Sequence, residues 1–132
     1  LNFDVNKIID QLFDKLSNFD ITKSNTKIFI DKSLENFFYI DLILNIFPNA
    51  KFIHTYRNLN DNIMAIFQKM LTNISWTHSL ENILNYVDNY LKIINDFKKK
   101  YPDKILSVNL KELTNQNEDW SKKIYSFCGY FF

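Results

Sequence analysis

Apolar residues recur along this chain in two spacings, one typical of helices and one typical of short buried strands. At 5–16 the apolar positions follow the i, i+3, i+4 pattern of an amphipathic helix. The same pattern extends over 80–97, where Ser79 can cap the helix and Pro102 must end it. Further helices are predicted at 37–47, where the chain is apolar nearly all round, at 61–71 and at 118–128, with Gly129 at the C′ position.

Three short continuous apolar runs predict buried strands at 27–30, 51–56 and 104–108. Predicted helices lie between them, so the strands need crossover connections and form a parallel sheet. The expected fold is therefore α/β, with a parallel sheet flanked by helices. Three strands are few for such a sheet, and the chain begins at Leu1 rather than Met. We therefore expect it to be incomplete at its N-terminus.

Composition narrows the possible classes of protein. The chain has 132 residues, of which 46% are hydrophobic and 17% aromatic, which is enough for a single folded domain. Its net charge is +1, so no general attraction to nucleic acid is expected. No apolar run is long enough to span a membrane. A cytoplasmic location is expected only by default.

Several kinds of site are excluded by the scarcity of key residues. The single cysteine, Cys128, rules out an internal disulfide and a cysteine-based zinc site. His54 and His78 cannot hold a metal by themselves, so no metal is expected. The single glycine, Gly129, cannot build a Gly-rich phosphate loop of either common kind.

Two cations follow predicted strands. Lys32 comes after the first strand, and Arg57, the single arginine among fifteen lysines, comes after the second. Ligands of open α/β sheets bind beyond the carboxyl ends of the strands. The amides at the start of the helix near Asp61 would point to the same edge. This combination favours a phosphate or sulfate ligand.

The order of several motifs resembles that of sulfotransferases that use 3′-phosphoadenosine 5′-phosphosulfate (PAPS), in particular bacterial TPR-linked and protein-tyrosine sulfotransferases. Those proteins have a DK-x-P-x-N-[FY] segment, an FPNA[KR] segment opening a strand that ends in Arg, paired tyrosines on a long helix, a YP-x-K strand and a closing FCG. The matching residues here are 30–37, 44–57, Tyr86 with Tyr90, 101–108 and 127–129.

The resemblance implies a P-loop-like fold that moves a sulfuryl group from PAPS to a hydroxyl or amine of an acceptor such as a protein or glycan. It assigns Arg57 to the 3′-phosphate of the nucleotide cosubstrate, which suits the planar fork of arginine. Lys69 matches a further basic residue near that phosphate. Lys32 matches the lysine that contacts the transferring sulfuryl group, where a cation stabilises charge on the bridging oxygen.

The chain also departs from the family pattern. Ala65 stands where relatives have a serine that donates to the 3′-phosphate, and Leu34 replaces the proline of the DK-x-P segment. A family segment with a tyrosine near the nucleotide reads Leu-Lys-Glu-Leu at 110–113. The 5′-phosphosulfate loop and the usual catalytic base would lie upstream of Leu1. We therefore expect residues 1–132, one sulfotransferase-like domain without that loop, to be inactive alone.

Other interpretations stay open. Lys32 and Lys69 can be solvated cations, and Arg57 can be an ordinary ion-pair partner. His54 lies in an apolar strand and is expected to be a hydrogen-bonded core histidine. As a whole, the chain can also be a non-catalytic remnant serving as a structural or interaction module, or a small α/β domain for another phosphorylated ligand.

Overall fold

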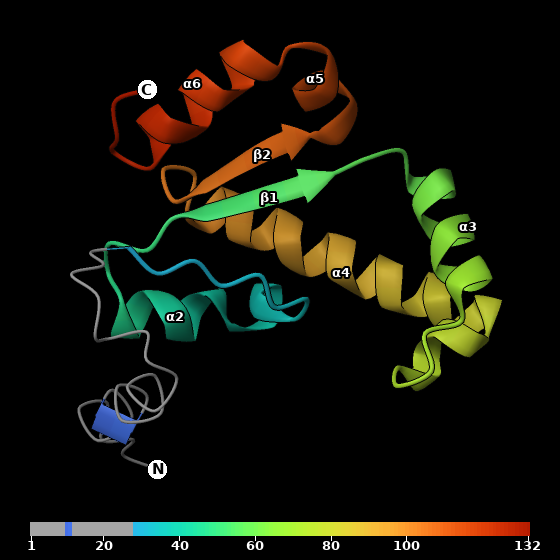
Figure 1. The fold of residues 1–132 in the computed structure, drawn as a ribbon. Coiled ribbons are helices and arrows are strands. Elements are labelled where there is room, and N and C mark those ends of the chain that lie inside the picture. Colours follow the sequence, from blue (N-terminus) through green and yellow to red (C-terminus); the bar gives the residue numbers. More distant parts are fainter. Residues whose placement is uncertain (1–9, 12–27) are drawn as a thin grey trace. The chain divides into compact units, whose positions relative to one another are not determined.

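The chain divides into two compact units, Leu1–Asn49 and Ala50–Phe132. The computed structural model describes residues 10–11 and 28–132 (Figure 1). The helix predicted at 5–16 therefore lies outside the described residues, except for Asp10 and Gln11, which are helical.

In the first unit, the strand predicted at 27–30 is not formed where the structure describes it. Ile28, Phe29 and Ile30 are without regular structure and are 49%, 60% and 79% exposed. An extended segment becomes a strand only through hydrogen bonds to a neighbouring strand. In the described part of the chain, the only such ladder joins two other segments. The prediction of a third strand is therefore wrong for residues 28–30.

The helix predicted at 37–47 is present as a short 3₁₀ helix, η1 (Asn36–Tyr39), followed by α2 (Ile40–Ile46). A run that is apolar nearly all round favours a buried helix, but the structure buries one side of it. Ile40 is 1% exposed, whereas Phe38, Tyr39 and Leu42 are between 42% and 52% exposed. So short a helix turns one side inward, and its remaining apolar side chains face outward.

The second unit contains a two-stranded parallel sheet, as the crossover argument predicted. Strand β1 (Phe52–Tyr56) pairs with β2 (Ile105–Asn109), in a register that places His54 beside Ser107. Figure 1 shows the helix α4 (Leu80–Lys100) along one face of this sheet and the helices that follow β2 along the other.

The helices of the second unit largely follow the sequence pattern. Helix α3 (Leu59–Lys69) begins two residues before the predicted start, and Ser79 caps α4 by accepting from the amide of Asn82. Helix α6 (Asn117–Phe127) ends at Phe127 and is followed by the C-cap Cys128 and by Gly129 at C′, whose φ of +82° suits glycine. The structure adds α5 (Leu110–Asn115) and a 3₁₀ helix, η2 (Ser75–His78), which were not predicted.

One cluster of core residues in this unit lies where α3, η2 and α4 meet. Its buried residues are Ile63, Ile83 and Val87, and Ile66, Trp76 and Leu91 pack against them. The rings of Trp76 and Tyr86 lie parallel, with centroids 3.8 Å apart. This packing holds α3 against α4. Because β1 leads into α3, the packing also fixes the position of the end of β1.

Candidate functional site

Arg57 lies directly after β1 and before α3, as the sequence predicted. Its guanidinium turns toward the first turn of α3, where Nε donates to Oδ1 of Asn62 at 3.3 Å. Nη2 donates to the main-chain oxygen of Asp61 at 3.5 Å. These two bonds occupy the side edge of the planar group. Because Arg57 is exposed, its end edge, formed by Nη1 and Nη2, is accessible for bidentate anion binding.

Two amides at the start of α3 already have a hydrogen-bond partner. Oδ1 of Asn58 accepts from the amides of Asn60 at 2.9 Å and Asp61 at 3.2 Å. An asparagine N-cap satisfies the donors that a bound anion would otherwise use. Two of the main-chain donors at this helix end are therefore paired with the chain's own cap, and Arg57 is the exposed cation beside them.

Three residues of interest share one face of α3. Asn62, Ala65 and Lys69 are spaced by three and four residues, the spacing that aligns side chains on a helix. Ala65 is half-buried and provides no polar group. Lys69 is the last residue of α3, about 10 Å along the axis from Asn62. The structure thus places Lys69 on the same face as Asn62, but at the opposite end of the helix from Arg57.

Lys32 lies in the first unit, in a turn organised by Asp31. Oδ1 of Asp31 accepts from both the amide and the hydroxyl of Ser33, at 2.9 and 2.6 Å. These bonds lower the pKa of Asp31, because they stabilise its charged form. Lys32 is exposed. The strand that was expected to carry it to the sheet edge is not formed, so the sheet argument no longer links Lys32 with Arg57.

A cluster of titratable side chains lies where β1 packs on α4. His54 Nε2 is hydrogen-bonded to the hydroxyl of Tyr90, and its ring stacks on that of Tyr56. Lys98 lies over the Tyr56 ring, with Nζ 6.0 Å from the ring centroid. Burial, with a contribution from the charge of Lys98, lowers the pKa of His54 to about 4. The prediction that His54 is hydrogen-bonded is confirmed. Its uncharged ring joins β1, the strand that leads to Arg57, to helix α4.

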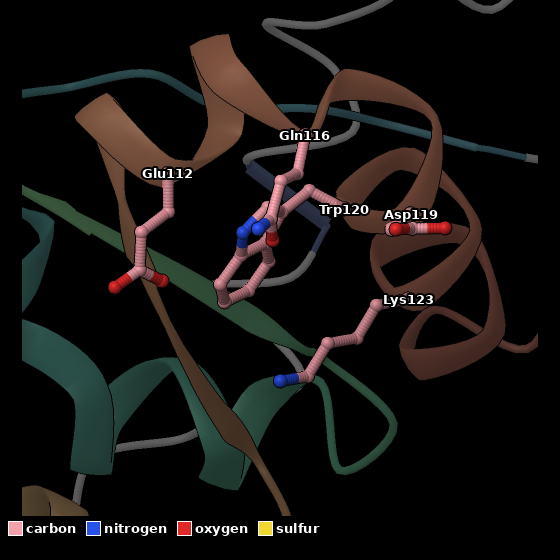
Figure 2. A pocket seen from close by; sticks show the side chains of 5 residues that line it. All are labelled: Glu112, Gln116, Asp119, Trp120 and Lys123. Carbon is pink, nitrogen blue, oxygen red and sulfur yellow. The ribbon is translucent and has the colours of Figure 1, made fainter.

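A shallow depression that the sequence did not predict lies on α5 and α6. Figure 2 shows its lining residues, Glu112, Gln116, Asp119, Trp120 and Lys123. Lys123 Nζ lies 4.4 Å from the centre of the Trp120 ring, so the chain's own cation covers that ring. Acidic, amide and basic side chains are mixed in the lining of this depression, so it does not present a single sign of charge to a ligand.

Two other kinds of site are not seen in the part of the chain that the structure describes. No group of three or more histidine, cysteine or carboxylate side chains is placed to bind a metal ion within residues 10–11 and 28–132. Over the same residues, no helix combines the length and apolarity needed to cross a membrane.

Comparison with known proteins identifies the family. The model of the sulfotransferase family matches residues 4–132. A relative from Aquifex aeolicus (strain VF5), described as an uncharacterized protein, is 29% identical over 103 residues. That match covers 75% of this chain but only 14% of the relative, so the chain spans a small part of that protein's length. No solved structure is significantly similar. Because the family model covers nearly the whole chain, the chain belongs to the sulfotransferase family.

Proposed function

We propose that residues 1–132 form part of one PAPS-dependent sulfotransferase domain with a P-loop-like fold and that they bind the 3′-phosphate of the nucleotide. The observation that carries this proposal is the arrangement of Arg57. The side edge of its guanidinium is held by α3, and its exposed end edge can donate to two phosphate oxygens. Lys69, on the same helix, is proposed as a further cation near this phosphate.

Lys32 is proposed to act on the transferring group. In sulfuryl transfer, the bond between sulfur and the bridging phosphate oxygen breaks while a bond from sulfur to the acceptor oxygen or nitrogen forms. Negative charge develops on the bridging oxygen, and a lysine ammonium there stabilises it. The turn formed by Asp31 and Ser33 supports this role, because it fixes the main chain on both sides of Lys32.

We also propose that residues 1–132 do not transfer sulfuryl groups alone. Sulfuryl transfer needs a loop that holds the 5′-phosphosulfate and a base that takes the acceptor's proton. In the family resemblance, neither this loop nor this base has a matching segment within residues 1–132. A single glycine also cannot form a Gly-rich loop. Binding and activity should therefore be measured on the native protein with whatever sequence precedes Leu1.

The first test is Arg57→Ala in that protein. We expect affinity for adenosine 3′,5′-bisphosphate to fall about 30-fold, because a charge-assisted bidentate contact is lost. Affinity for adenosine 5′-phosphate, which lacks the 3′-phosphate, should change little. Isothermal titration calorimetry measures both. Arg57→Lys is the matched control, which keeps the charge but loses the fork, and should recover only part of the affinity.

Lys32→Ala provides the second arm of the same experiment. If Lys32 contacts the transferring group, its loss should lower kcat more than it weakens nucleotide binding. The reverse pattern would assign Lys32 to ground-state binding of the nucleotide.

A non-catalytic remnant is the second candidate function, and Ala65 is the observation that favours it. This position provides no hydroxyl on the helix face that carries Asn62 and Lys69. If the native protein binds the two nucleotides equally well, the 3′-phosphate site is absent and the remnant interpretation replaces the enzyme.

A further inference from the structure

Asn62 contacts the one arginine of this chain through a specific atom. Its Oδ1 accepts from Arg57 Nε, and only the oxygen of a carboxamide can accept such a bond. Asn62 is itself fixed, because its main-chain amide donates to the oxygen of Asn58 at 3.1 Å and its side chain is half-buried. The contact therefore joins an exposed cation to a well-anchored position of α3.

The direction of this contact decides which edge of the guanidinium a ligand can reach. An arginine can bind a phosphate through its side edge, Nε with one Nη, or through its end edge, Nη1 with Nη2. Here the side edge is used by Asn62 and by the main-chain oxygen of Asp61. A free guanidinium would present both edges and would sample several side-chain rotamers.

We infer that Asn62 is a positioning residue. It holds Arg57 by the side edge of the guanidinium, so that the end edge faces the 3′-phosphate. This inference rests on the proposed function. The neutral carboxamide orients Arg57 and leaves its positive charge intact, whereas a carboxylate at this position would neutralise that charge. The contact also acts in a helix whose Ala65 provides no hydroxyl to the phosphate, so the orientation of Arg57 has more influence on binding.

The contact can be observed directly, because this chain has a single arginine. The Arg57 Nε–H gives one side-chain signal in a ¹H–¹⁵N NMR spectrum of residues 1–132. We expect Asn62→Ala to increase its exchange with solvent. Asn62→Asp, which keeps an oxygen acceptor, should restore slow exchange. Asn60→Ala is the matched control: it lies in the same turn, is exposed and contacts Asn58 only through its main chain.

Nucleotide binding tests the functional part of the inference in the native protein. We expect Asn62→Ala to lower affinity for adenosine 3′,5′-bisphosphate about fivefold and to leave affinity for adenosine 5′-phosphate unchanged. A general structural defect would weaken both equally, and Asn60→Ala should weaken neither.

The outcomes separate this inference from the proposed function. If Arg57→Ala removes the preference for the 3′-phosphate but Asn62→Ala does not, the positioning role is overturned and the phosphate site stands. An Nε–H signal that exchanges equally fast in the unsubstituted chain and in Asn62→Ala also overturns the positioning role. If the unsubstituted protein shows no preference between the nucleotides, the proposed function itself fails.

Discussion

At the scale of single residues, His54 gives the most specific expectation about pH. Its ring is enclosed by Tyr90 of α4 and Tyr56 of its own strand, and the charge of Lys98 acts on it. Burial lowers the pKa of His54 to about 4 in the folded chain, whereas its ordinary value is 6.5. The same enclosure raises the pKa of Tyr90 and lowers that of Lys98, so burial opposes charge throughout the cluster.

The depressed pKa of His54 predicts that acid destabilises the fold. Between pH 6.5 and 4, the unfolded chain binds a proton at His54 that the folded chain does not, so stability falls as the pH falls through this window. Below that window the contribution is constant. Urea unfolding at several pH values should show that His54→Phe makes the stability less steeply dependent on pH between 4 and 6.5.

The exposed His78, which lies beside Leu71, provides the control for this measurement. His78→Gln should retain the steep loss of stability that His54 causes. An unchanged slope in His54→Phe would contradict the assignment to His54.

Residue chemistry could be predicted from the sequence only where it depends on near neighbours. The place of Arg57 after a strand follows from the apolar run before it. Its bond to Asn62 does not, because the contact crosses from a strand end to a helix and depends on where α3 begins. The pairing of two α3 amides with Asn58 was likewise not predicted from the sequence, which placed the start of the helix near Asp61.

At the scale of elements, the N-cap of α3 has a measurable effect on stability. Asn58 accepts from two amides of the first turn, so Asn58→Ala should lower the free energy of unfolding by about 1 kcal/mol. The same turn carries the groups that hold Arg57, so affinity for the 3′-phosphate should fall as well. Urea unfolding measures the first effect and calorimetry the second.

Two comparisons make the Asn58 prediction specific. Asn60→Ala, in the same turn but outside the cap, should cost much less. Asn58→Gly should also cost less than Asn58→Ala, because glycine is tolerated at N-caps. Equal losses from Asn58→Ala and Asn60→Ala would show that the cap contributes nothing measurable.

Elements with long periodic patterns or strong end signals were predicted well. Ser79 and Pro102 bracket α4, and its apolar stripe leaves little choice of structure. Helix α5 was missed because its six residues are too few to show a period. The failed strand near Phe29 shows the opposite limit: an apolar run favours a strand, but hydrogen bonds to a neighbour decide whether one forms.

At the scale of the whole molecule, the nearly balanced charge means that binding depends on local geometry. A net charge of +1 creates no broad field to attract a nucleotide. Under the proposed function, recognition of the 3′-phosphate therefore comes from placed groups such as Arg57. This is why orientation of one guanidinium can affect specificity.

The distribution of buried side chains predicts unequal local stability. Buried apolar residues of the second unit lie on α3, α4 and β2, whereas Ile40 is the one such residue in the described part of the first unit. Amides exchange slowly where opening exposes much buried surface. Among the described residues, hydrogen-exchange mass spectrometry should therefore show the slowest exchange in α4 and β2, intermediate exchange in α2 and the fastest at 28–35, where the chain lacks helical or strand hydrogen bonds.

Val87→Ala should speed exchange across α4, because it leaves a cavity in the cluster that Val87 and Ile83 of α4 form with Ile63 of α3. Exchange in α2 as slow as in α4 would contradict this account, since it would require stabilising contacts beyond the burial of Ile40.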